Sequence, residues 1–302
     1  MKVGIIGIGH VGTSVALSIL QAGIAHEVLL YDLDLAKAQG EAMDLAHGAP
    51  FYPSASVRPA SMEEIAKADV VVFAAGRNGR PGETRLHLLN DNVKVIGIVG
   101  SQLRGSQATL VVVSNPVDVL TKVMKEFSGL PFSKVIGAGT MLDTARLRQR
   151  LAERLRIDSR SIHASVIGEH GDSEIVLWSS ARIGSRPLRA WRGWNSSDES
   201  QISEEVRRAA YEIIQRKGAT NHAIGLVTAD LVRSILRDER RVLTVSRVQD
   251  GIKGLEDVAI SLPAIVGREG AVEIVEPEMD EKESQAFARS AQVLREALGS
   301  VQ

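Results

Sequence analysis

Lys2-Val3-Gly4-Ile5-Ile6-Gly7-Ile8-Gly9-His10-Val11-Gly12 places a short apolar run directly before three spaced glycines. The apolar run predicts a buried strand, and the apolar pattern that continues to Leu20 predicts a helix. A Gly-x-Gly-x-x-Gly turn between a strand and a helix is typical of dinucleotide sites, because glycine permits a tight turn and a close approach of phosphate. The N–H groups that begin the helix would face that phosphate.

Asp32 strengthens this interpretation. It ends a second predicted strand, residues 27–31, about 20 residues beyond the glycine turn, where such sites carry a ribose-binding acid. A carboxylate there repels a 2′-phosphate, so the sequence predicts NAD in preference to NADP. The alternative is a simple Gly-rich turn with Asp32 as a helix cap. The cofactor residues predicted from this pattern are Gly7, Gly9, Gly12 and Asp32.

The apolar runs that follow predict further strands over residues 69–75, 109–113 and 134–136, with helical stretches between them. Short, continuously apolar strands alternating with helices indicate a parallel sheet covered on both faces. We therefore expect an α/β protein: a doubly wound, parallel-sheet (Rossmann) domain over 1–139, then a mixed α+β substrate domain over 140–302.

Composition excludes several classes of protein. The 302 residues carry 36 basic and 37 acidic side chains, a net charge of −1, which argues against a general nucleic-acid surface. With no cysteine there are no disulfides, thiolate nucleophiles or Cys-ligated metals, and we predict no metal site. No apolar run reaches the roughly 20 residues that span a bilayer. We expect a cytoplasmic protein without a signal peptide.

A single histidine, His170, stands in Gly168-Glu169-His170-Gly171-Asp172 between two glycines. Its side chain can exchange a proton near neutral pH, and a carboxylate beside it would fix the ring and stabilise its charged form. Asp143 is the candidate carboxylate. The alternatives are a turn histidine at 170, a capping box between Thr140 and Asp143, and a surface pair between Asp143 and Arg146.

Two other stretches lie beside predicted strand ends. Residues 76–85 contain three glycines, a proline and three arginines, a composition typical of active-site lids or of plain solvated loops. Asn115 follows a strand at the carboxyl edge of the sheet, where doubly wound folds bind ligands, although it could simply cap the next helix.

With these motifs in place, the chain resembles the L-lactate and malate dehydrogenase family over essentially its whole length, and most closely its bacterial lactate members. The matching pieces are the glycine turn with Asp32, Arg-Pro-Gly-Glu-Thr-Arg at 80–85, Ser-Asn-Pro at 114–116, Leu-Asp-Thr-Ala-Arg at 142–146, Gly-Glu-His-Gly-Asp at 168–172 and Lys-Gly-Ala-Thr at 217–220. Glu83 and Thr84 favour the lactate members, since malate members tend to carry Met and Ser there.

The resemblance implies a role for each matching residue. His170 would be the acid and base, oriented by Asp143, and Arg85 would polarise the substrate carbonyl. Arg146 would grip the substrate carboxylate with two parallel hydrogen bonds. The implied substrate contacts are Arg146, Asn115, Thr220, Gly79 and Arg80. To the cofactor site the resemblance adds Val11, Gly76, Asn92, Val113 and Asn115.

The resemblance also implies a homo-oligomer, a tetramer or a dimer, with Arg148 and His163 binding fructose 1,6-bisphosphate between subunits. The implied reaction is NADH-dependent reduction of a small 2-oxo acid, pyruvate first. Gly79 departs from the family, because lactate members usually carry Gln and malate members Arg at this position; it predicts broader substrate use. The alternatives are a malate or broad-range 2-hydroxy acid dehydrogenase, and a non-catalytic NAD-binding sensor or scaffold.

Overall fold

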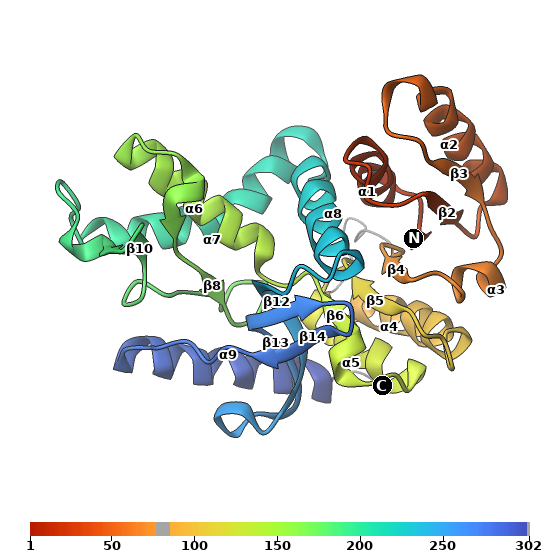
Figure 1. Ribbon diagram of the computed structural model, residues 1–302. Helices are drawn as coiled ribbons and strands as arrows, with labels where there is room; N and C mark the ends of the chain where they lie inside the picture. Colours follow the sequence, from red (N-terminus) through yellow and green to blue (C-terminus); the bar gives the residue numbers. More distant parts are fainter. Residues whose placement is uncertain (77–84, 301–302) are drawn as a thin grey trace.

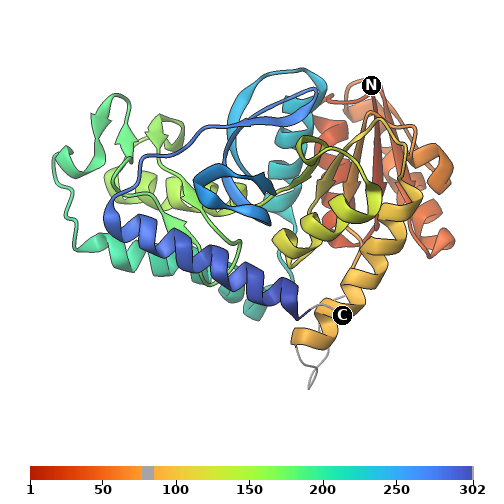
Figure 2. The same ribbon diagram turned by 90° about the horizontal axis from the view of Figure 1, so that it is seen from below.

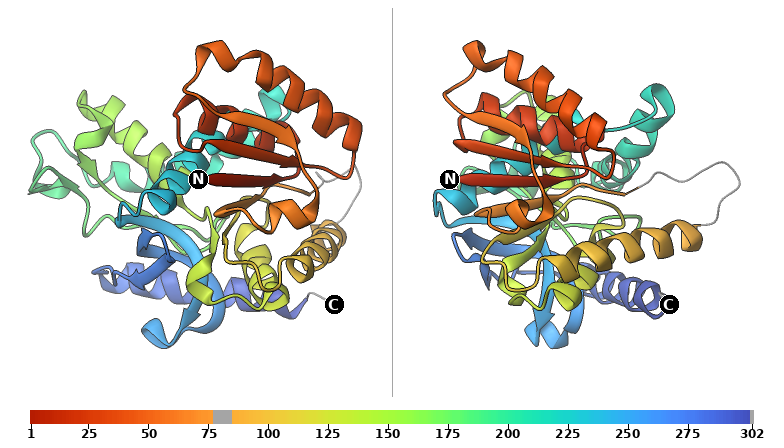
Figure 3. Two further views of the ribbon diagram at one scale, coloured as in Figure 1. Left: turned by 45° about the vertical axis from the view of Figure 1, so that its right-hand side comes forward. Right: turned by 90° about the vertical axis from the view of Figure 1, so that its right-hand side faces the viewer.

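The computed structural model describes residues 1–76 and 85–300, without the side chains of 85–88 and 253. The first half is a parallel sheet in the order β6-β5-β4-β1-β2-β3, with helices on both faces. Figure 3 shows α1 (His10–Gln21) and α2 (Leu35–His47) over one face and α4 (Arg85–Gln102) and α5 (Val117–Ser128) over the other. The predicted doubly wound sheet is confirmed. Its strands are β1 (Lys2–Ile6), β2 (Glu27–Tyr31), β3 (Ser56–Pro59), β4 (Val70–Phe73), β5 (Thr109–Val112) and β6 (Val135–Gly137).

The helices of this half are α1 (His10–Gln21), α2 (Leu35–His47), α3 (Met62–Ile65), α4 (Arg85–Gln102) and α5 (Val117–Ser128). Every residue of β4 and β5 is buried, which explains the continuous apolar runs in their sequence. The edge strand β3 was not predicted, because Ser56-Val57-Arg58-Pro59 has only one large apolar side chain. Pro116 precedes α5 as its N-cap.

The second half extends the same sheet (Figure 1). The strands β12 (Arg241–Asp250), β13 (Glu256–Gly267) and β14 (Gly270–Ile274) are antiparallel, and β12 joins β6 where Ser246 pairs with Gly137. Within the described residues this makes one sheet of nine strands. The sheet therefore continues across residue 139, where the sequence predicts a domain boundary.

Two small antiparallel sheets and four long helices complete this half. The sheets are β11-β10-β7 and β8-β9, built from β7 (Ile162–His163), β8 (Val166–Ile167), β9 (Ile175–Val176), β10 (Arg182–Ile183) and β11 (Arg186–Pro187). The helices are α6 (Met141–Leu155), α7 (Asp198–Lys217), α8 (His222–Leu236) and α9 (Glu281–Gly299). Figure 2 shows α9 running along one side of the molecule toward α4 and α5. The expected mixed α+β half is confirmed.

The two halves share a core. One buried cluster contains Ile19 of α1, Val232 of α8 and Ile260 of β13. The helix α8 packs on α1, and Asn221 before α8 donates from Nδ2 to the Ser14 hydroxyl at 2.9 Å. The helix that follows the glycine turn is thus fixed against the second half. Across the part of the chain described here, no helix is long and apolar enough to cross a membrane.

Gly225 of α8 sets this close approach. A Cβ added there would lie 2.8 Å from the backbone carbonyl of Ser14, so α8 and α1 would have to separate. We expect Gly225→Ala to lower the free energy of unfolding by about 1–3 kcal/mol, measured by urea denaturation. The matched control is Gly40→Ala in α2, where a Cβ meets nothing within 4 Å. Because alanine favours a helix more than glycine does, Gly40→Ala should raise the free energy of unfolding by about 0.5–1 kcal/mol. Equal effects of the two substitutions would contradict the packing argument.

Candidate active site

The glycine turn has the shape that the sequence predicts. Gly7 has φ +92°, and a Cβ there would lie 2.4 Å from the backbone of Ala75. A Cβ on Gly12 would lie 2.0 Å from the carbonyl oxygen of Gly7. A Cβ on Gly9, in contrast, would meet nothing within 4 Å, so the middle glycine faces open space. Two of the glycines are therefore required by packing, and the third leaves room for a ligand to approach the backbone.

The N-terminus of α1 fits a phosphate. Gly9 is the N-cap, no side chain caps the helix, and its first turn contains no acidic residue. Its first N–H groups and the positive end of the helix dipole thus remain available to an anion. Asp32 lies beside the turn, where its Oδ2 accepts a hydrogen bond from the N–H of Ile8 at 2.8 Å. The residues present fit a dinucleotide cofactor.

Further predicted cofactor residues lie at the carboxyl ends of β4 and β5. Gly76 follows β4, and Val113 and Asn115 follow β5. The buried side chain of Asn92 donates from Nδ2 to the carbonyl oxygen of Asn115 at 3.2 Å, which ties α4 to this edge. Val11 is partly buried in the first turn of α1. The fold therefore brings this set of residues to one edge of the sheet.

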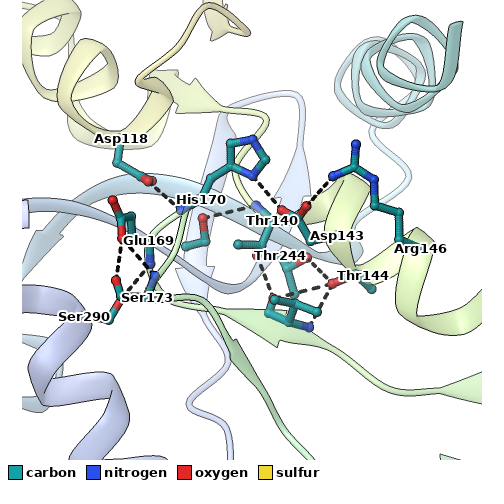
Figure 4. Close-up of polar contacts among 12 residues, drawn as sticks. Asp118, Thr140, Asp143, Thr144, Arg146, Glu169, His170, Ser173, Thr244 and Ser290 are labelled. Carbon is teal, nitrogen blue, oxygen red and sulfur yellow. Dashed lines mark hydrogen bonds and ion pairs between the residues drawn. The ribbon is translucent and has the colours of Figure 1, made fainter. Parts of the chain in front are cut away.

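The fold brings His170 and Asp143 together. Nδ1 of His170 lies 2.6 Å from Oδ2 of Asp143, and the Nη1 of Arg146 donates to the other oxygen of Asp143 at 2.8 Å (Figure 4). Asp143 is 2% exposed, so its carboxylate is buried between one histidine and one arginine. The capping box does not form, because the hydroxyl of Thr140 donates instead to the carbonyl oxygen of Val166 at 2.6 Å.

The backbone around His170 is fixed from three directions. The N–H of His170 donates to Asp118 of α5 at 2.8 Å, and the N–H of Glu169 donates to the hydroxyl of Ser290 in α9 at 2.8 Å. Gly168 pairs with Ser261 of β13. Asp118 is a site residue that the sequence analysis missed. Its only signal is an acid in the first turn of a helix beside the Ser-Asn-Pro motif, which usually means an exposed charge.

Electrostatics favour a charged imidazole. Burial by itself would lower the pKa of His170, but the charges of Asp143, Asp118 and Glu174 outweigh it and raise the pKa to about 9. Burial opposes ionisation of Asp143 too, yet His170 and Arg146 hold its pKa below the ordinary value. Burial raises the pKa of Asp118 to about 6. The imidazole is thus a protonated donor at neutral pH.

Within the described part of the chain, one group of side chains has the spacing of a metal site. It consists of Asp143, His170 and Glu174, with one possible ligand atom of each within 4.8 Å of the others. However, Nδ1 of His170 and Oδ2 of Asp143 already share one hydrogen bond, and Arg146 adds a positive charge beside them. This arrangement suits a proton better than a metal ion.

The other predicted site residues are only partly tested. Gly79 and Arg80 lie outside the described residues, as does the side chain of Arg85, whose backbone begins α4. Thr220 is half-buried between α7 and α8. Arg148 donates from Nε to the carbonyl oxygen of Ala164 at 3.0 Å and lines a cavity of about 410 Å³.

His163 is exposed on β7, outside the residues that line the cavity at Arg148. The structure therefore does not place these two residues in one cavity of a single chain.

Comparison with family models matches residues 1–137 to the NAD-binding domain of lactate/malate dehydrogenases and residues 140–302 to their alpha/beta C-terminal domain. Among curated proteins, the chain is 45% identical to an L-lactate dehydrogenase of Synechococcus sp. over 100% of this chain and 99% of that protein. It is 46% identical to an L-lactate dehydrogenase of Thermus aquaticus, again over 100% and 99%.

Solved structures agree with these relatives. A minor L-lactate dehydrogenase from Enterococcus mundtii, in a ligand-bound form, superposes with a TM-score of 0.96 at 39% identity, covering 100% of this chain and 98% of that one. A lactate dehydrogenase from a deep-sea metagenome library gives a TM-score of 0.95 at 42% identity, covering 99% and 98%.

The pairing of Asp143 with His170 generates a direct test. In Asp143→Asn the negative charge that most favours the imidazolium is gone, while the burial that opposes it remains. We expect the pKa of His170 to fall from about 9 to the ordinary value of about 6.5 or below it. NMR of the labelled imidazole measures this titration. The control is Glu63→Gln, an exposed carboxylate of α3, which should leave the titration in place. An unchanged midpoint in Asp143→Asn would contradict the assignment.

Proposed function

We propose, from the premise that the chain belongs to the lactate/malate dehydrogenase family, that it is an L-lactate dehydrogenase that interconverts pyruvate and L-lactate with NAD. The observation that carries the proposal is Asp143 bridging His170 and Arg146 in the same structure as an intact dinucleotide turn. A proton donor, a carboxylate-binding group and a cofactor site are the parts that reduction of a 2-oxo acid requires.

Three residues of the chain have separate roles in the proposed reaction. Arg146 binds the substrate carboxylate, and its ion pair with Asp143 fixes the plane of the guanidinium that makes two parallel hydrogen bonds. His170 donates its proton to the ketone oxygen during reduction and takes it back during oxidation. Asp143 orients the ring and stabilises its charged form. When bound, the nicotinamide supplies the hydride.

The geometry of the first half supports the proposed cofactor contacts. In the proposal the pyrophosphate binds beside Gly9, over the N-terminus of α1, where a Cβ would meet nothing within 4 Å, and Asp32 beside the same turn accepts hydrogen bonds from the adenine-side ribose. We assign cofactor binding to residues 1–139 and the substrate chemistry mainly to 140–302. Asn115 and Thr220 complete the pocket in this proposal, together with Arg85, Gly79 and Arg80.

The identity of the substrate rests on the relatives, which are L-lactate dehydrogenases. They lend no support to a malate enzyme or a non-catalytic sensor. Gly79 lies outside the described residues, so the broader tolerance of longer 2-oxo acids remains a prediction from sequence. We also propose a cytoplasmic location.

We further propose a tetramer that binds fructose 1,6-bisphosphate. Supporting it, Arg148, Arg160 and Arg241 line one cavity of about 410 Å³ that also contains Asp230, so the charged lining residues have a net positive charge that suits phosphate groups. Arg148 lies on the same helix as Arg146, one turn or less away, so an anion held there can bias the substrate site.

The test of the reaction is His170→Ala. Without the acid we expect kcat for pyruvate reduction to fall by about 10²–10⁴-fold, while NADH binding, followed by fluorescence, is retained. His26→Ala, an exposed histidine before β2, is the matched control and should keep full activity. If pyruvate turnover survives the loss of His170, the proposed acid is wrong.

The test of regulation compares pyruvate saturation with and without fructose 1,6-bisphosphate at several pH values. We expect the bisphosphate to lower KM in the unmodified chain and to have no effect on Arg148→Ala. Arg182→Ala, an exposed arginine of β10 outside the cavity, should keep the response. Analytical ultracentrifugation should show a tetramer. Identical curves for the unmodified protein would remove the regulatory proposal and leave the reaction untouched.

A further inference from the structure

Glu174 has no role in the reaction as described above, yet it is buried beside the groups that perform it. It lies four residues after His170, directly before β9, and is only 6% exposed. Its Oε1 is completely buried and, among the described residues, has no hydrogen-bond partner. A buried carboxyl with an unpartnered oxygen is costly, so its presence here calls for a physical reason.

The surroundings of Glu174 are charged. Asp143, His170 and Glu174 each place one polar atom within 4.8 Å of the others. The other charges that act on this carboxyl are those of Arg146 on α6 and Arg207 on α7. Glu174 therefore belongs to the same electrostatic cluster as the proton donor.

Two more acids complete the set of charges around the cluster. Asp118 of α5 acts on His170 from its backbone side, and it also interacts with Glu169. Arg207 is partly neutralised, because its Nη1 pairs with Glu204 at 2.6 Å. Among the described residues, the charges that most affect the carboxyl of Glu174 are thus those of one acid, one imidazole and two guanidinium groups.

We propose that Glu174 is a positioning residue for proton transfer, a buried carboxyl that acts through His170 and keeps the imidazole protonated in alkaline solution. The inference rests on the proposed lactate dehydrogenase reaction, in which His170 must carry a proton to reduce pyruvate. It adds a residue that holds and releases a proton of its own without touching the substrate.

The direction of the effect follows from the two titrations. Burial is the main reason that the pKa of Glu174 is raised to about 8, and the negative charge of Asp143 is the second. The positive charges of His170, Arg207 and Arg146 oppose the rise. The pKa of His170 is raised to about 9. Near neutral pH Glu174 is therefore an uncharged acid and His170 is charged.

Above pH 8 Glu174 loses its proton, and the new negative charge lies close to the imidazolium. An opposite charge at this separation favours the charged form, so His170 keeps its proton to higher pH than it otherwise would. The pair thus extends the pH range of pyruvate reduction at its alkaline end.

The experiment is the pH profile of kcat/KM for pyruvate with saturating NADH, in the unmodified chain and in Glu174→Gln. Gln copies the shape of the protonated acid and cannot ionise, so the two profiles should coincide near pH 6. The alkaline midpoint of Glu174→Gln should lie about 1 pH unit lower, since nearby opposite charges shift a pKa by about 1–3 units. At pH 9 this corresponds to a loss of about fivefold.

The matched control is Glu205→Gln, which removes a carboxylate of α7 that pairs with Arg150 away from the cluster. Its profile should coincide with that of the unmodified chain. A Glu174→Gln profile with the same alkaline midpoint as the control overturns the proposal. A uniform loss of activity at all pH values also overturns it, because it would show a purely structural role.

A second measurement does not depend on turnover or on the variant's folding. Carbon-13 NMR of labelled glutamate in the unmodified chain should show one carboxyl that titrates near pH 8, and labelled imidazole should report His170. A Glu174 that titrates at the ordinary value of about 4.3 overturns the proposal. If pyruvate is not turned over but both NMR titrations hold, the proposed substrate is wrong and the Glu174–His170 coupling stands.

Discussion

The structure depends on one buried carboxylate, that of Asp143, held between His170 and Arg146. A carboxylate that is 2% exposed is tolerable only when its charge is paired and its oxygens are hydrogen-bonded. Here the two partners are also the two groups to which we assign proton donation and binding of the substrate carboxylate. Pairing the charge of Asp143 therefore orients the proposed proton donor and the proposed carboxylate-binding group at once. It also fixes where the first turn of α6 lies relative to the loop after β8.

That loop is fixed by elements from distant parts of the chain. Asp118 comes from α5 in the cofactor half, Ser261 from β13 and Ser290 from α9. The continuous nine-stranded sheet of the described residues, with β12 beside β6, makes this possible because it joins both halves. Hydride and proton transfer need donor and acceptor in one rigid frame, and a shared sheet supplies that frame.

The sequence predicted the elements that depend on interactions between residues close together in the chain. The glycine turn, the apolar strands β1, β2, β4, β5 and β6, and the helix from 141 each follow from steric demands or periodicity within a few residues. The antiparallel extension β12-β13-β14 could not be foreseen in its pairing with β6, because that contact joins Gly137 to Ser246, far away in sequence. Asp118 and Glu174 were missed for a similar reason: an acid beside a polar motif normally indicates solvent, and burial is decided by distant elements.

The charges of the side chains around His170 explain why one of its neighbouring acids is kept uncharged. Near neutral pH, Asp143 and Asp118 carry two negative charges, and His170 and Arg146 carry two positive ones. With Glu174 holding its proton these four charges cancel before a substrate carboxylate enters. An ionised Glu174 would add a negative charge close to the entering anion, in surroundings of low dielectric where repulsion is strong. When His170 then donates its proton to the ketone oxygen, the imidazole loses its positive charge, so an acid that stays neutral at this point limits the negative charge left on these side chains. A buried carboxyl with a raised pKa therefore suits a site that must admit an anion and release a proton in the same turnover.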